Sequence, residues 1–215
     1  TGEFYHIFNR GVARQTIFSS LNDYQQAVLA LSYYQFSSPL IKLSRFKRLS
    51  RLEKQKLINE IGLKNKKIVQ IISFVLMPNH FHFLLKQTFE EGITKFVSQF
   101  TNSYVRYFNT KHTRVGPMFQ GPFKSVHVES EEQLIHLSRY IHLNPYVSSV
   151  VKKSELTTYP WSSYPDYLKD SSNLVNLSPI LSRFKSVSEY QAFVSNHADY
   201  ARELEIIKHL TLDID

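Results

Sequence analysis

The sequence predicts an α+β protein of the ferredoxin-like class, in which one antiparallel sheet carries helices on one face. Strand-length apolar runs and amphipathic segments follow one another in the order β, α, insertion, β, β, α, β, α. Without the insertion, this is the order of a split βαβ fold. The chain has 215 residues, which is enough for one such domain with an extension.

The N-terminal part of the chain is expected to form one strand, one helix and a basic insertion. Residues 4–8 are aromatic or β-branched and precede the turn-forming sequence Asn9-Arg10-Gly11. A helix is expected over residues 24–35, with Asn22 or Asp23 as its N-cap. The insertion then covers about residues 37–66.

A hairpin and a long helix follow the insertion. Residues 68–76 and 81–86 are apolar runs of strand length, and residues 77–79 between them suit a tight turn. Residues 92–109 carry large apolar side chains at spacings of three and four, which predicts a helix.

The last strand of the sheet is expected over residues 123–128, which alternate like a half-buried strand. Ser130 and Gln133 resemble a capping box that opens a further helix, and Pro145 is expected to end it. We predict that the main domain covers residues 1–168 and that residues 169–215 form a small helical C-terminal extension.

The chain is basic, with a formal charge of +8 at pH 7, which favours a polyanionic partner. Residues 42–56 carry much of this charge, and Glu53 is their only acid. A solvated helix face would have the same composition. We nevertheless predict that this stretch binds nucleic acid, through Arg45, Lys47, Arg48 and Arg51.

The composition also limits the class of protein. Cysteine is absent, so a metal would be held by His, Asn, Gln or carboxylate side chains. The sequence contains no apolar run long enough to cross a bilayer, and no signal peptide is recognised. We therefore expect a cytoplasmic protein of bacterial type, associated with the nucleoid and without a membrane partner.

His80-Phe81-His82 is the sharpest local motif. Side chains two apart on a strand point to the same face, so His80 and His82 can converge on one metal ion while Phe81 enters the core. An HxH motif by itself is weak, since two histidines near a strand end more often have ordinary structural roles.

A second group of polar residues lies on the helix before Pro145. His136, Tyr140 and Asn144 are spaced by four and share one helix stripe. A tyrosine hydroxyl can act as a covalent nucleophile, and an amide oxygen can bind a hard cation. The structural alternative is that Tyr140 packs and Asn144 caps the end of the helix, and the spacing alone favours this alternative.

Three longer motifs make the sequence recognisable. Residues 77–85 read MPNHFHFLL, residues 119–125 read FQGPFKS and residues 138–145 read SRYIHLNP. Together with Asn9-Arg10-Gly11 and the sequence YPWSSY at residues 159–164, they resemble the single-tyrosine transposases of the HUH superfamily. The resemblance spans about residues 4–168 and is greatest to the REP-associated tyrosine transposases.

This resemblance implies a metal-dependent enzyme that nicks and joins single-stranded, hairpin or palindromic repeat DNA. By analogy, His80, His82 and Asn144 would bind Mg²⁺ or Mn²⁺, and Tyr140 would form a 5′-phosphotyrosine intermediate. A phenol is a poor nucleophile at neutral pH, so His136 or His142 could assist it. Nucleic-acid contacts are also expected from Arg10 and Lys124. The protein would act as a monomer or a homodimer.

The chain departs from many relatives at Phe123, where some carry a tyrosine, and at Pro122, where some carry an arginine. If that tyrosine were the nucleophile in such relatives, Tyr140 would have to replace it here.

Two other functions are compatible with the sequence. A non-catalytic ferredoxin-like protein could bind single strands through exposed aromatics, and a hydrolase could act on small phosphoesters. The binder would need no metal. The hydrolase would form no covalent adduct with a tyrosine. That function would also give the basic insertion no role.

Overall fold

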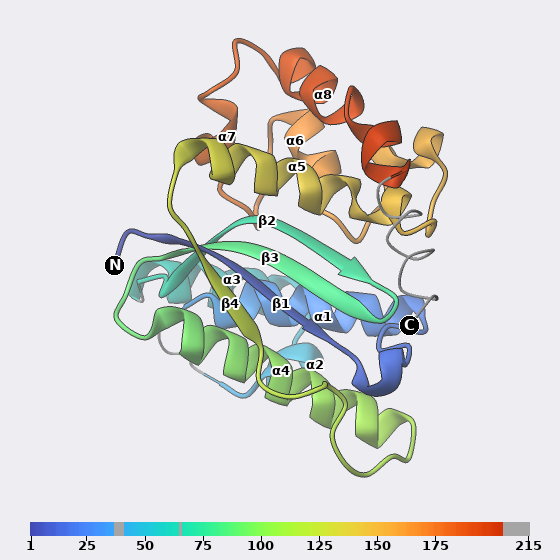
Figure 1. Ribbon diagram of the computed structural model, residues 1–215. Coiled ribbons are helices and arrows are strands. Elements are labelled where there is room, and N and C mark those ends of the chain that lie inside the picture. Colours follow the sequence, from blue (N-terminus) through green and yellow to red (C-terminus); the bar gives the residue numbers. More distant parts are fainter. Residues whose placement is uncertain (37–40, 65, 204–215) are drawn as a thin grey trace.

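The computed structural model describes residues 1–36, 41–64 and 66–203, and its centre is a four-stranded antiparallel sheet (Figure 1). The strands lie in the order β2-β3-β1-β4, and each neighbouring pair is antiparallel. The predicted α+β class and the split βαβ strand order are confirmed. The strands are β1 (Phe4–Arg10), β2 (Val69–Met77), β3 (His80–Gln87) and β4 (Lys124–Val128).

Helices cover both faces of the sheet, so the expectation of helices on one face was wrong. The helices α1 (Leu21–Tyr34) and α4 (Gly92–Lys111) lie on one side, and α5 (Glu131–Val147) packs against β2 and β3 on the other (Figure 1). Every residue from His80 to Leu85 is buried. A strand buried on both faces needs a covering layer on each.

Successive side chains of β3 point to opposite faces of the sheet, so phenylalanines and histidines lie on different sides. The rings of Phe81 and Phe83 pack edge-on against Phe100 of α4, at 5.5 and 5.3 Å between centroids. The intervening His80 and His82 face α5, where His82 meets the ring of Tyr140. The expectation that Phe81 enters the core is therefore confirmed, and His80 and His82 lie on the other face of β3.

Two expected helix boundaries are corrected by the structure. The N-cap of α1 is Ser20, whose hydroxyl accepts a hydrogen bond from the backbone N–H of Asp23. Pro145 does not end α5, which continues to Val147. Proline removes the hydrogen bond that residue 145 would donate to the carbonyl oxygen four residues before it, but the helix continues past it, and the backbone N–H of Ser148 donates to the carbonyl oxygen of Asn144. The Ser130 cap of α5 is present as predicted.

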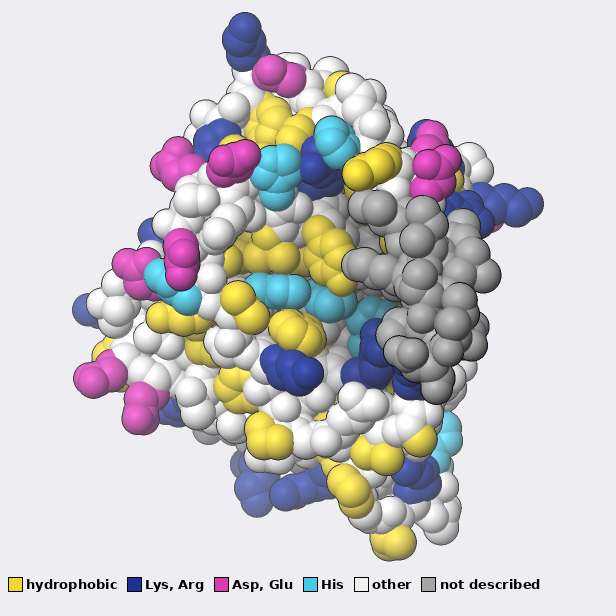
Figure 2. Space-filling model, viewed as in Figure 1, with side chains coloured by type: hydrophobic (Ala, Val, Ile, Leu, Met, Phe, Trp, Pro, Cys, Tyr) yellow, Lys and Arg dark blue, Asp and Glu magenta, His cyan; other side chains and the backbone are white. Residues whose placement is uncertain are grey.

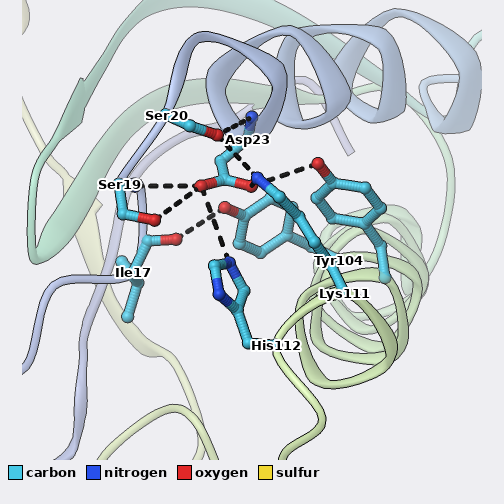
Figure 3. Close-up of polar contacts among 8 residues, drawn as sticks. Ile17, Ser19, Ser20, Asp23, Tyr104, Lys111 and His112 are labelled. Atoms are coloured by element: carbon cyan, nitrogen blue, oxygen red, sulfur yellow. Dashed lines mark hydrogen bonds and ion pairs between the residues drawn. The ribbon is translucent and has the colours of Figure 1, made fainter.

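The buried carboxylate of Asp23 joins α1 to α4 (Figure 3). Its Oδ1 lies 2.7 Å from Nζ of Lys111 and accepts a hydrogen bond from the hydroxyl of Tyr107 at 3.1 Å. Its Oδ2 accepts a bond from the hydroxyl of Ser19 at 2.8 Å. Burial opposes ionisation, but bonds from Lys111, Ser19 and Ser20 hold the pKa of Asp23 well below its usual range.

The basic insertion folds as two helices, α2 (Leu43–Arg48) and α3 (Arg51–Lys64). Residues 37–40 and 65 of the expected insertion lie outside the described residues. Leu43 and Phe46 of α2 are buried, and the ring of Phe46 lies 5.0 Å from that of Tyr33 in α1. The apolar side of α2 thus docks on α1, and its cations remain exposed.

The C-terminal segments pack on the outer side of α5 (Figure 1). They are η2 (Lys153–Thr158), α6 (Tyr164–Lys169), α7 (Ser178–Leu181) and α8 (Val187–Ser195), while residues 204–215 of the expected extension lie outside the described residues. Tyr190 of α8 is fully buried, and its hydroxyl bonds to Ser138 and His142 of α5. The domain boundary at residue 168 remains a prediction.

Across the described ranges, no helix combines the length and the apolar character needed to cross a bilayer.

Candidate functional site

A cleft of about 490 Å³ opens where α5 faces the ends of β1, β3 and β4. Figure 2 shows histidine side chains in a hollow on this face, between hydrophobic side chains, with Lys and Arg close by. The sequence-predicted residues His80, His82, Tyr140, Asn144, Arg10 and Lys124 all line this cleft. The other lining residues are Phe8, Asn9, Gln120, Gly121, Pro122, Val147 and Ser148.

His80 faces an amide oxygen on each side of its ring. Its Nδ1 lies 2.6 Å from Oδ1 of Asn79, and its Nε2 lies 3.2 Å from Oδ1 of Asn144. The amide nitrogen of Asn79 donates to the carbonyl oxygen of Arg14, which directs the amide oxygen toward His80. Both ring nitrogens therefore meet hydrogen-bond acceptors.

A neutral imidazole has only one N–H and cannot donate to both oxygens. Burial, reinforced by the charge of Arg10, lowers the pKa of His80 to about 4, so the ring is neutral at pH 7. If the ring donates to the shorter contact, to Asn79, the lone pair of Nε2 faces Oδ1 of Asn144, and a cation bound by both atoms would satisfy them.

The spacing of these two atoms also fits a cation. Two ligand atoms at right angles on one octahedral Mg²⁺, each about 2.1 Å from the ion, lie about 3 Å apart. The distance of 3.2 Å between His80 Nε2 and Asn144 Oδ1 is compatible with this value, and it is equally that of a hydrogen bond. Within the described ranges, no group of three or more His, Cys, Asp or Glu side chains could hold a metal, so a metal ion in this cleft would need the amide of Asn144 as a ligand as well.

His82 is positioned by a residue of the neighbouring strand. Its Nδ1 lies 2.9 Å from Nε2 of His6 on β1, and the two rings stack at 5.1 Å between centroids. Burial, with the nearby His80, His6 and Arg10, lowers the pKa of His82 well below its usual value. A neutral ring whose Nδ1 is bonded to His6 could bind a metal ion through its other nitrogen, Nε2.

Tyr140 closes one side of the cleft. Its ring meets those of His82 and His6 edge-on, at 5.3 and 6.2 Å between centroids. The side chain is 46% exposed, although it lies next to buried histidines. A phenol held at the cleft surface beside a neutral imidazole pair can reach a phosphate bound there.

Arg10 and Lys124 supply positive charge on the strand side of the cleft. The backbone around Arg10 is fixed by Asn9, whose side chain donates to the carbonyl oxygen of Gly121 at 3.0 Å. The backbone N–H of Gln120 donates to the carbonyl oxygen of Arg10 at 2.9 Å. Pro122 lines the cleft, whereas Phe123 packs against the core.

The four cations predicted in the insertion do not reach the cleft. Arg45, Lys47 and Arg48 lie on α2, and Arg51 begins α3, on the side of the sheet occupied by α1 and α4. Any nucleic-acid contact that they make is therefore separate from the cleft.

Neither auxiliary histidine lines the cleft. His142 is buried in the outer layer, with Nδ1 2.7 Å from the hydroxyl of Tyr190 and Nε2 2.8 Å from Oγ of Ser163. Both of its nitrogens are thus engaged away from the cleft, and it supports the packing of α5. His136 lies at the surface, where its Nδ1 contacts the guanidinium of Arg139 at 2.7 Å.

Sequence reasoning missed His6 and Asn79. His6 belongs to an alternating strand, so the same two-residue rule that singled out His80 and His82 places it on one face with Phe8. Its partner could not be deduced, because the contact depends on the register that sets His6 opposite Leu84 and Phe8 opposite His82.

Comparisons with known proteins agree with this fold. Residues 42–144 match the family model described as "Transposase IS200 like". A solved structure of a REP-associated tyrosine transposase bound to a REP hairpin superposes with a TM-score of 0.50. The superposed part covers 82% of this chain and 84% of the transposase chain, and the two sequences are 14% identical. No curated protein matches the sequence. Residues 42–144, a little under half of the chain, are therefore similar to the IS200-like transposases, and most of the chain shares the fold of the solved transposase.

Proposed function

We propose that the chain is a divalent-metal-dependent DNA nickase and strand-transfer enzyme of the single-tyrosine transposase type. The observation that carries the proposal is the convergence of His80, His82, Asn144 and Tyr140 in one cleft. The paired acceptors on His80 and Asn144 support a bound cation, for which Mg²⁺ or Mn²⁺ is the expected ion. The similar transposase was solved with a REP hairpin, which supports hairpin DNA as the substrate.

His80, His82 and Asn144 would hold the metal ion, which when bound polarises the scissile phosphate and offsets its developing charge. Arg10 and Lys124 would bind the flanking phosphates on the opposite side of the cleft. Because Tyr140 is half exposed, its phenolic proton can leave to water as its oxygen attacks.

The attack forms a bond between the Tyr140 oxygen and phosphorus, and breaks the bond from phosphorus to the 3′ oxygen of the preceding nucleotide. That nucleotide leaves with a 3′-hydroxyl, and the DNA on the other side stays attached as a 5′-phosphotyrosine. A later attack by a 3′-hydroxyl on this linkage joins strands and regenerates the tyrosine. The bond energy is conserved throughout, so no nucleotide cofactor is needed.

Incubation with labelled hairpin DNA and Mn²⁺ tests the proposal through a covalent protein–DNA adduct that survives denaturing electrophoresis. Tyr140→Phe should abolish the adduct, because no oxygen remains to attack phosphorus. Tyr200→Phe is the matched control, since Tyr200 is also exposed but lies outside the cleft. An adduct that persists in Tyr140→Phe would refute the assignment of the nucleophile.

His80→Ala and chelation separate this enzyme from a non-catalytic binder of single strands. The enzyme should lose cleavage in both cases. A binder should retain its affinity for DNA with or without metal and should form no adduct.

A further inference from the structure

We propose that a groove between α1, α2 and α4 is a second binding site for single-stranded DNA, separate from the cleft. The groove has a volume of about 1140 Å³ and is lined by side chains from these three helices. It deepens the proposed function, since it would hold another part of the same DNA. Its existence does not depend on the nicking reaction.

The charge of the groove is positive. Lys42, Arg45, Lys47 and Arg106 line it, and none of its lining residues is acidic. Within the described parts of the chain, none of these four cations has a carboxylate at ion-pair distance, whereas the fifth, Lys111, is neutralised by Asp23. Four uncompensated cations along one groove suit a phosphodiester backbone.

The uncharged residues that line the groove favour a ligand with nucleic-acid bases over a polyanion without them. The rings of Tyr34 and Tyr107 border the groove, and Nζ of Lys47 lies 5.3 Å from the Tyr107 ring centre. The Oε1 atoms of Gln26 and Gln99 are buried there and have no hydrogen-bond partner among the described residues. Aromatic rings stack on unpaired bases, and amides bond to their edges.

The amides of the groove favour a single strand over a duplex. The Oε1 atoms of Gln26 and Gln99 are buried where they line the groove, and only unpaired bases offer free Watson–Crick edges to such groups. In a duplex, the base edges would not reach side chains at the groove floor. The site therefore suits an unpaired segment next to a hairpin rather than the hairpin stem.

The groove and the catalytic cleft share no lining residue and lie on opposite sides of the sheet. A strand in the groove is therefore distant from the scissile phosphate. We expect the groove to increase affinity for DNA that carries an unpaired tail, without changing the rate of the chemical step.

Binding of a fluorescein-labelled oligothymidylate of about 20 nucleotides, in EDTA, tests the groove without any contribution from cleavage. The test variant is Lys47→Ala/Arg106→Ala, and the charge-matched control is Lys169→Ala/Lys185→Ala. All four side chains are exposed, so both variants should fold. Thermal melting verifies this.

Each phosphate contact to a single strand contributes about 0.7 to the slope of log affinity against log salt. Removing two contacts should reduce the slope by about 1.4, which at about 0.1 M salt is a loss of about 25-fold in affinity. The control should keep the original slope. Equal losses in both variants would show a general charge effect and overturn the proposal.

Tyr34→Leu tests the contribution of bases, because it removes a ring without removing charge. We expect at least about fivefold weaker binding of the oligothymidylate and unchanged binding of a blunt duplex. An unchanged affinity for the oligothymidylate would overturn base binding in the groove. Because no metal is present, neither result depends on whether Tyr140 is the nucleophile.

Discussion

His142 links the stability of the protein to pH, because it is buried as a neutral ring with both nitrogens bonded to hydroxyls. Burial lowers its pKa from 6.5 in an exposed state to about 3 in the folded protein. Between these values the unfolded chain binds a proton that the folded chain does not. Acid therefore favours unfolding in this window, and the stability present above pH 6.5 is lost as the pH falls toward 3.

The expected magnitude follows from the width of this window. Each unit of pKa difference corresponds to about 1.4 kcal/mol, so the contribution of His142 between pH 6.5 and 3 is about 5 kcal/mol. This is a large part of the stability of a typical domain. His142→Gln removes the titration but keeps an amide that can bond to Tyr190 or Ser163.

Urea unfolding at a series of pH values from 7 to 4 measures the effect. The free energy of unfolding of the native protein should fall more steeply with acid than that of His142→Gln, by about 1.4 kcal/mol per pH unit below pH 6. His136→Gln is the matched control, because it removes a histidine of the same helix from the surface. Parallel curves for the native protein and His142→Gln would refute the reasoning.

Three further substitutions test other parts of the structure. Lys111→Ala should destabilise the protein by about 2 kcal/mol in urea unfolding, because it leaves the Asp23 carboxylate buried without its cation; Lys111→Ala/Asp23→Asn should be more stable than Lys111→Ala. Gly92→Ala should cost about 2 kcal/mol, since its Cβ would lie 2.2 Å from the carbonyl oxygen of Ile68, and unaltered melting would contradict this. His6→Ala should weaken Mn²⁺ binding about tenfold in calorimetry, through loss of its contact with His82; full affinity would show that the contact is not needed.

The order of the elements along the chain and the two-histidine face could be predicted because both follow from local periodicity. A period of two on β3 places His80 and His82 together, and a spacing of four on α5 places Tyr140 near Asn144. What brings the two pairs into one cleft is the packing of α5 on β3. The sequence only indicated this through a resemblance to transposases.

The second helical layer could not be predicted, because its contacts are between segments far apart in the chain. Tyr190 reaches His142 across 48 positions, and no local pattern links them. The sequence offers His142 only as a group that could assist Tyr140, two positions before it. In a helix, that separation turns a side chain to nearly the opposite face.

The two hydrogen bonds of His142 also restrict how strands could be exchanged. Tyr140 and His142 lie on the same helix, so a rotation of α5 that turned Tyr140 away from the cleft would break the buried bonds to Tyr190 and Ser163. A DNA end attached to Tyr140 would therefore remain at a fixed place in the protein. Under the proposed function, the incoming 3′-hydroxyl would have to travel to the tyrosine, so flexibility in the DNA, rather than a moving helix, would determine which ends are joined.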